Sequence, residues 1–320
     1  MSQLPQTMIS CRSFGGAMAR FLPPVVWLMV MLWCAGCTAV DTKPVACLQQ
    51  AMEANHKAAM GILKGVNEEM LPARIEQGVA GTTFSKDDLS LLTPADVAAW
   101  DDILSGLEAY CAALGDLTAD KSSAAFATAS GSFGLKIQSL VKAVKGSSAP
   151  SIGSARTAVG ELGGILIKYQ TSREARAIAK AADPSFQTAI RSLIDALGFA
   201  GRPPTPAPHG LLATCEVNFW AMHAEKSDKQ FKGDAIAGFD AMTPAERRAA
   251  IKDFIAWLGV EEDHKELVAS VAALAAALDK AAAAHAALAQ GSPGQIDAAF
   301  AELRAEIQTT VQICQKLQKG

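Results

Sequence analysis

Two cysteines near the start of the chain have the spacing of a redox-active pair. They lie in the stretch Cys34-Ala35-Gly36-Cys37, which has the C-x-x-C form of thiol–disulfide oxidoreductases. In those enzymes the pair lies at a strand-to-helix junction of a folded domain, where one thiol is activated. Here the pair directly follows an apolar run from Val25 to Trp33. Its position in an apolar leader therefore argues against redox chemistry.

The residues around this pair are typical of a processing signal. Arg12 and Arg20 precede Phe21 without any acidic residue, and the short apolar run follows Pro23-Pro24. A transmembrane helix needs about 20 apolar residues, and this run is about half as long. A positive segment followed by a short apolar segment is the pattern of a secretory signal peptide. Residues 1–36 are therefore predicted to be a signal peptide.

Small residues directly before Cys37 resemble the lipobox of bacterial lipoproteins. The one departure is Cys34, where the lipobox usually has Leu. The resemblance implies that Cys37 carries the acyl chains, palmitate among them, and becomes the first residue of the mature chain. Several acyl chains anchor a protein stably to a membrane, whereas one binds only marginally. Thr38, in the place of an Asp, implies sorting to the outer membrane, facing the periplasm. The alternative is an ordinary signal peptide that is cleaved without lipidation.

The remaining cysteines of the mature chain are even in number. An even number of cysteines in an exported protein favours disulfide bonds, and four cysteines allow three connectivities. We expect Cys47–Cys111 and Cys215–Cys314, because each bond would join residues within one half of the chain. The alternative is that all four are buried free thiols.

Three histidines are candidates for ligand binding. His56 and His223 each follow a cysteine at nearly the same spacing, and neutral imidazole binds transition metals readily. Neither belongs to an H-E-x-x-H motif, so we expect no metal. His285 lies on an apolar stripe and would need hydrogen-bond partners if buried. It is either a satisfied core histidine or a group that orients a ligand inside the bundle.

Composition and periodicity predict an all-α, multi-helix bundle. The chain has 320 residues, of which 50% are hydrophobic and only 6% aromatic, and its formal net charge is −3. An Ala-rich, aromatic-poor composition favours closely packed helices over sheets, and no period-two alternation appears. The mild negative charge argues against a nucleic-acid partner. The clearest stripe repeats four and three apart, at Leu267, Val271, Leu274, Leu278, Ala281, His285 and Leu288.

Helix starts are marked by Thr, Asp or Ser followed by Pro. Thr93-Pro94 and Thr243-Pro244 each place an acid at the third helical position, as a capping box requires. The acids around His264, in the segment 261–266, are interpreted as a first helical turn that the helix dipole favours. The predicted helices span about 43–70, 85–91, 94–117, 121–145, 151–181, 184–199, 210–231, 233–241, 244–258, 261–290 and 293–318.

A proline-rich segment separates two helical regions. The segment 201–209 contains Gly-Arg-Pro-Pro-Thr-Pro-Ala-Pro, which predicts a stiff, extended spacer. It divides the mature chain into an N-terminal helical region, 37–200, and a C-terminal one, 210–320. These regions are either two halves or parts of one bundle.

These features favour a non-enzymatic envelope protein over other classes. The chain has no G-x-S-x-G, P-loop, dinucleotide-binding or haem-attachment motif, so we assign no catalytic residue and no cofactor. We expect a helical interaction or structural module, held to the bacterial membrane by Cys37, with an envelope protein as its partner. The first alternative is a bundle that binds a small molecule, a metal or haem near His285. The second is an envelope enzyme.

Overall fold

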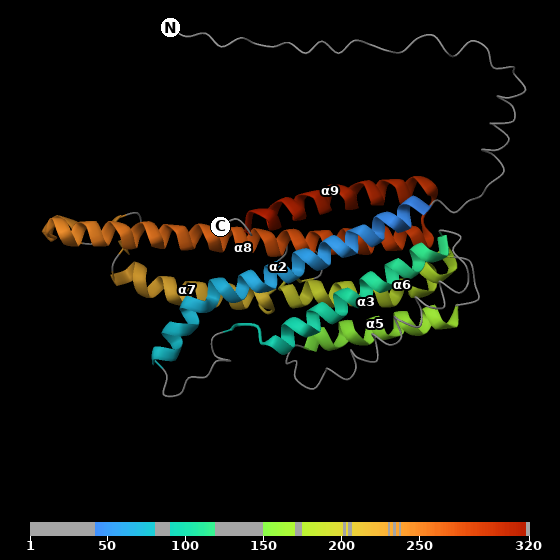
Figure 1. The fold of residues 1–320 in the computed structure, drawn as a ribbon, viewed down its shortest axis with the longest axis horizontal. Coiled ribbons are helices and arrows are strands. Elements are labelled where there is room, and N and C mark those ends of the chain that lie inside the picture. Colours follow the sequence, from blue (N-terminus) through green and yellow to red (C-terminus); the bar gives the residue numbers. More distant parts are fainter. Residues whose placement is uncertain are drawn as a thin grey trace, which may run out of the picture. The chain divides into compact units, whose positions relative to one another are not determined.

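A computed structural model describes most of the chain after the leader. It covers residues 42–80, 90–118, 150–169, 175–200, 203, 207–229, 231–232, 235–236 and 238–317. The predicted signal peptide, Cys37 and the helices expected at 121–145 and over most of 85–91 lie outside these residues. The described residues form seven α-helices (Figure 1): α2 (Thr42–Ala80), α3 (Pro94–Thr118), α5 (Pro150–Lys168), α6 (Ala175–Leu197), α7 (Leu211–Lys229), α8 (Pro244–Gln290) and α9 (Pro293–Leu317).

Two of the predicted capping boxes start helices as expected. At α3, the Thr93 hydroxyl donates to Asp96 Oδ2 at 2.7 Å and accepts from the Asp96 backbone N–H at 3.2 Å. At α8, Thr243 and Glu246 form the same reciprocal pair. Each helix then has Pro at its first position, where the missing N–H costs nothing. The all-α fold class is confirmed.

Some predicted boundaries are wrong. α6 continues through Pro184, where a helix start was expected. α8 continues through Gly259, so the acids near His264 lie in the middle of a helix and not in its first turn. The helix expected at 233–241 is replaced by the two-residue strands β1 (Phe231–Lys232) and β2 (Ala235–Ile236) and the 3₁₀ helix η2 (Phe239–Ala241). Local proline and glycine signals mark boundaries only where packing does not override them.

The core forms around the second half of α8. All seven residues of its predicted stripe are buried, from Leu267 to Leu288. α8 packs against α2, α6 and α9, while α3 packs against α2 and α5. Helices from both sides of the proline-rich segment therefore share one core. Close packing of small and medium aliphatic side chains explains why the chain needs so few aromatic residues.

The apolar character of α8 follows from this burial. It contains a window of 18 residues whose mean hydropathy of 1.6 is high enough for a membrane span, but 61% of that window is buried inside the bundle. A core helix surrounded by other helices is expected to be apolar on all sides. Length and composition alone are therefore weak grounds for placing α8 in a membrane.

The residues that flank the proline-rich segment lie close together. Gly198 and Gly210, which flank it, touch each other: a Cβ built on Gly210 would lie 2.6 Å from the Gly198 Cα atom. The Ala207 N–H donates to the Gly198 carbonyl at 2.8 Å, and both glycines have positive φ. The two ends of the segment therefore meet between α6 and α7. Residues 201, 202 and 204–206 lie outside the described residues, so the extended spacer stays a prediction.

Candidate functional site

Three buried side chains form a continuous hydrogen-bonded chain across the core. Tyr110 on α3 lies with its hydroxyl 2.9 Å from His285 Nε2, and His285 Nδ1 lies 2.9 Å from Asp183 Oδ1. Gln187 donates to the same carboxylate oxygen at 3.2 Å and to the Ala282 carbonyl at 2.8 Å. We call Tyr110, His285 and Asp183 the core relay. It connects three helices that are far apart in the sequence.

Burial fixes the protonation states of the core relay. Burial lowers the pKa of His285 and raises the pKa of Tyr110 well above its usual value. Burial also raises the pKa of Asp183, but hydrogen bonds from His285 and Gln187 outweigh it and hold that pKa below its usual value. The imidazole is therefore neutral: Nδ1–H donates to the carboxylate and Nε2 accepts from the tyrosine hydroxyl. Every polar atom of the imidazole ring has a partner.

The core relay links a hydroxyl, an imidazole and a carboxylate in the order found in a catalytic triad. Its surroundings, however, favour a structural role. His285 and Tyr110 have no exposed surface, and Phe186 stacks on the imidazole with ring centroids 4.2 Å apart. A reacting group must touch its substrate, and neither described pocket is lined by these residues. His285 is thus placed in the core as a satisfied histidine, and a ligand would have to displace Tyr110 or Asp183 to reach it.

His56 bridges two carboxylates between α2 and α3. Its Nε2 lies 2.8 Å from Asp101 Oδ1, and its Nδ1 lies 3.0 Å from Glu108 Oε2. The two oxygens approach opposite sides of the ring, so they do not converge on one point. Among the described residues, no three His, Cys, Asp or Glu side chains are grouped to hold a metal.

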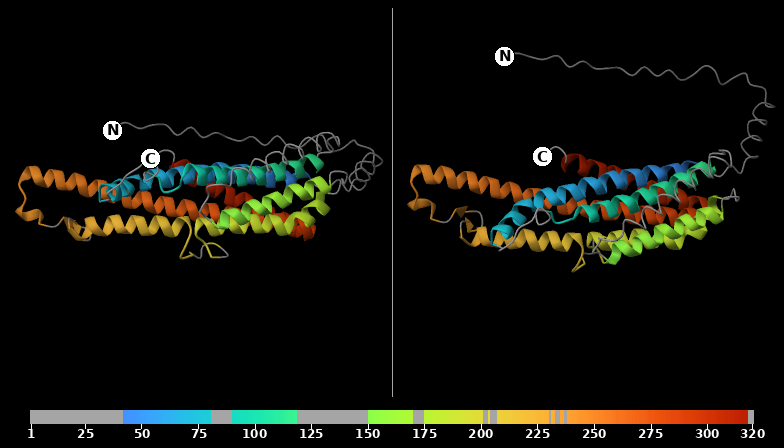
Figure 2. Two further views of the ribbon diagram at one scale, coloured as in Figure 1. Left: turned by 90° about the horizontal axis from the view of Figure 1, so that it is seen from below. Right: turned by 60° about the horizontal axis from the view of Figure 1, so that its bottom comes forward.

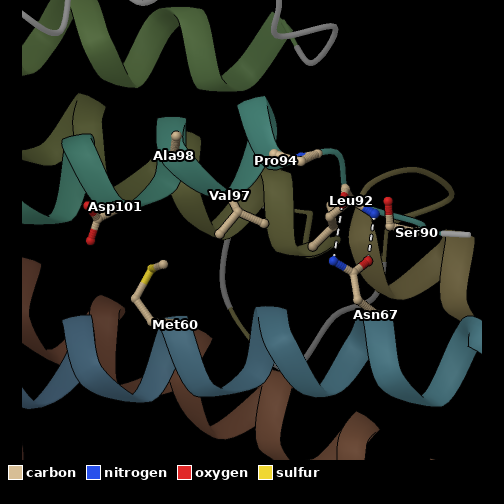
Figure 3. A pocket seen from close by; sticks show the side chains of 8 residues that line it. All are labelled: Met60, Asn67, Ser90, Leu92, Pro94, Val97, Ala98 and Asp101. Atoms are coloured by element: carbon tan, nitrogen blue, oxygen red, sulfur yellow. Dashed lines mark hydrogen bonds between the residues drawn. The ribbon is translucent and has the colours of Figure 1, made fainter. Parts of the chain in front are cut away.

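A shallow pocket lies next to this bridge. It has a volume of about 560 Å³ and opens between α2 and α3 (Figure 3). Met60, Leu92 and Val97 supply an apolar wall, and Asp101 lies at one end. At the other end, the Asn67 amide holds the backbone of Leu92 through bonds of 2.8 and 3.1 Å. An apolar wall ending in a carboxylate suits a small molecule with an apolar body and one cationic group.

The expected disulfide bonds are wrong. Cys47, Cys111 and Cys215 are buried and form no disulfide bond. Cys47 faces α9, where its sulfur accepts from Arg304 Nε at 3.3 Å. Cys111 is enclosed in the core, and burial raises its pKa above its usual value. The two thiols therefore face different neighbours. The side chains of Cys314 and His223 lie outside the described residues.

A stacked pair of rings joins α7 to α8. His264 is the first residue of α8 that is buried, among those whose burial is described. It stacks on Phe219 with ring centroids 3.7 Å apart, and its Nε2 lies 3.5 Å from Glu216 Oε1. This contact marks the end of the buried part of α8. Nothing N-terminal to His264 in this helix is buried, as far as side chains are described.

The first half of α8 presents an apolar face to solvent. Ile251, Ile255 and Leu258 are 41%, 63% and 42% exposed. α9 does not reach them, because Thr310 lies beside Ala273 and α9 ends only seven residues later. Figure 2 shows the orange first half of α8 continuing past the end of α9. On α7, Val217 and Trp220 are also exposed, at 69% and 57%.

Comparison of the chain with protein-family models, curated proteins and solved structures finds no match. The candidate sites therefore rest on the geometry of this chain. The most distinctive of them is the exposed apolar face at the start of α8.

Proposed function

We propose that this protein is a non-enzymatic, lipid-anchored envelope protein whose helical bundle serves as a protein-interaction module. The leader and its lipobox-like end support export and anchoring through Cys37. The exposed face of α8 supports the interaction role. The core supports a non-enzymatic role, because the histidine with the most triad-like environment is sealed and fully paired.

The observation that carries this proposal is a long stretch of α8 in which no described residue is buried. From Pro244 to Asp263, no residue whose burial is described is buried, although Ile251, Ile255 and Leu258 lie there. Most helical stability in proteins comes from packing of an apolar face, and monomeric proteins rarely expose large contiguous apolar patches. A helix of this kind suits a surface that another molecule covers.

The exposed face of α8 lies far from the N-terminal end of α2, because the two helices run in opposite directions. Gly65 of α2 lies beside Leu267 of α8. Nearer the start of α2, Gln49 lies beside Gly115 of α3, and Tyr110 on the same helix α3 contacts His285 of α8. α8 therefore runs antiparallel to α2. At 1.5 Å per residue, about 35 Å separate Thr42 from Gly65, and Ile255 lies about 18 Å further along α8. Thr42, the first described residue, thus lies about 50 Å from this face along the helix axes.

Membrane fractionation tests the anchoring. The full chain, made in a bacterium that processes lipoproteins, is compared with Cys37→Ala and with the matched control Cys34→Ala. Wild type and Cys34→Ala are expected in the membrane fraction, and Cys37→Ala in the soluble periplasm or as unprocessed precursor of higher mass. Membrane association of a processed Cys37→Ala chain, equal to that of wild type, would contradict anchoring through this residue.

The pocket beside Asp101 supports a second candidate, a small-molecule binding function. Its apolar wall and single carboxylate suit an amphipathic cation. Native mass spectrometry of the purified protein would detect a retained ligand. The ligand should be lost in Val97→Trp, which fills the pocket, and kept in Ala301→Trp, which lies on an exposed site of α9. A ligand kept in both variants would contradict binding at this pocket.

A further inference from the structure

The exposed face of α8 has a regular arrangement of apolar and charged residues. We call Arg248, Ile251, Ile255, Leu258 and Glu262 the α8 stripe; they follow one another at intervals of three and four residues. This spacing keeps them on one side of a helix. Arg248 and Glu262 are themselves exposed. The stripe thus has an apolar centre, a positive end and a negative end.

The charges of the α8 stripe are arranged symmetrically about its centre. Arg248 lies seven residues before Ile255, and Glu262 lies seven residues after it. If two copies of this helix pack antiparallel about a two-fold axis at Ile255, Arg248 of each copy meets Glu262 of the other. A parallel pair would instead set Arg248 against Arg248 and Glu262 against Glu262. The sequence is complementary to itself in the antiparallel direction only.

The shape of the helix fits the same arrangement. Gly259 lies four residues after Ile255, and Ile251 lies four residues before it. The two-fold axis therefore sets Ile251 of one copy against Gly259 of the other. A Cβ atom built on Gly259 meets no other atom within 4 Å, so the space beside it is open. A glycine opposite a large aliphatic side chain lets two helices approach closely.

We propose that a second copy of this chain covers the α8 stripe, in an antiparallel, two-fold symmetric dimer. Such an isologous contact uses the same patch on both subunits and closes on itself. The inference rests on the interaction role of the proposed function but not on the lipid anchor. An anionic lipid surface is a poorer occupant, because Glu261, Glu262 and Asp263 lie at one end of the face.

The size of the stripe predicts a dissociable dimer. Three apolar side chains from each copy, with a charged pair at each end, bury less than the roughly 1,000 Å² of a stable interface. Charged pairs at the rim of an interface set its orientation more than its strength. Dimerisation is therefore expected to depend on protein concentration.

Cysteine crosslinking in cells tests the dimer with the full chain. In Ile255→Cys the two-fold axis brings the new thiols together, so oxidation should give a disulfide-linked dimer. The matched control is Ile167→Cys, on α5, where a residue of the same type is 50% exposed. Wild type reports any dimer formed through its own cysteines. A dimer from Ile255→Cys alone supports the inference; its absence, or an equal yield from Ile167→Cys, overturns it.

Orientation is tested by mixing two differently tagged chains. Chains with Arg248→Cys and chains with Glu262→Cys, made together, should crosslink to each other more than either does to itself. A parallel dimer would give the reverse and overturn the antiparallel arrangement. An Ile255→Cys adduct with a different protein would overturn the second copy as occupant while leaving the interaction role standing. If Ile255→Cys forms no adduct at all, the interaction role fails as well, whatever Cys37→Ala does.

Charge reversal gives an independent check without new thiols. Sedimentation of the purified full chain in detergent should show that Arg248→Glu weakens self-association by about fivefold or more, since like charges then face each other. Adding Glu262→Arg to the same chain should restore it. If the double variant associates no better than Arg248→Glu, the two residues do not face each other and the proposed register is wrong.

Discussion

His285 Nδ1 on α8 lies 2.9 Å from Asp183 Oδ1 on α6, inside the core and beneath the stacked ring of Phe186. The carboxylate fixes the tautomer of the imidazole, and the imidazole then accepts from the Tyr110 hydroxyl. One hydrogen bond thus orients the next. Without either partner, a fully buried ring nitrogen would remain unpaired, which is costly in a low-dielectric interior.

Asp183→Ala should therefore destabilise the fold strongly. It leaves His285 Nδ1–H without its acceptor, at an expected cost of about 2–3 kcal/mol in the free energy of unfolding. Asp195→Ala is the matched control, because Asp195 lies on the same helix and pairs with exposed His209. That variant should change the free energy of unfolding by less than about 0.5 kcal/mol. Urea unfolding followed by circular dichroism measures both, and equal effects would contradict a buried relay.

Acid should weaken the protein through His285. Its pKa is lower in the folded than in the unfolded chain, so the unfolded chain binds more protons as pH falls. The stabilisation is present above the unfolded pKa of about 6.5 and is lost as pH falls below it. Asp183, whose pKa is also lowered, adds a loss in the same direction at more acidic pH. Between pH 7.5 and 5.5, the free energy of unfolding should fall more steeply in wild type than in His285→Gln; parallel curves would show that His285 is not buried as a neutral group.

Two asparagines of α2 should respond in opposite directions to the same substitution. Asn55 is fully buried, and neither polar atom of its amide has a hydrogen-bond partner among the described residues. Asn67 makes two bonds to the backbone of Leu92. Asn55→Leu should raise the free energy of unfolding by about 1 kcal/mol, and Asn67→Leu should lower it by about 1–2 kcal/mol. Thermal melts decide the matter, and a destabilised Asn55→Leu would mean that the amide is satisfied in the folded protein.

Changing either of two glycines to alanine should alter the free energy of unfolding, but in opposite directions. Gly210 has a φ of 92° and touches Gly198, so an added Cβ has no room. Gly153 lies within α5 with open space around it. Gly210→Ala should destabilise by more than about 1 kcal/mol, whereas Gly153→Ala should stabilise by about 0.5–1 kcal/mol. A neutral Gly210→Ala would show that the loop ends are not held together.

Sequence periodicity predicted the core of this fold but not the partners within it. The stripe from Leu267 to Leu288 is buried as expected, because a repeat of three and four residues depends only on helix geometry. The partners of His285 are 102 and 175 residues away in the sequence. Asp183 was instead interpreted as a helix start, since it precedes Pro184. A local signal and a tertiary contact compete for the same residue, and the tertiary contact decides.

Other features could not be predicted because they depend on packing. The number of cysteines was compatible both with disulfide bonds and with buried thiols. Only the neighbours of Cys47 and Cys111 in the fold distinguish these two predictions. The helices predicted at 244–258 and 261–290 form one helix through Gly259, because glycine inside a helix costs only about 1 kcal/mol. The exposure of Ile255 was likewise hidden, because apolar spacing does not tell whether a helix face meets the core or another molecule.

Hydrogen–deuterium exchange of the first half of α8 tests the central claim most directly, that this helix is a covered contact surface. The amides of residues 244–262 are followed at several concentrations of the full-length protein, with the core segment 267–289 as an internal reference. We predict that residues 244–262 become protected as concentration rises, that Ile255→Glu abolishes this change, and that the core segment stays slow throughout. Equal, fast exchange of residues 244–262 at every concentration, in wild type and variant alike, would contradict the claim.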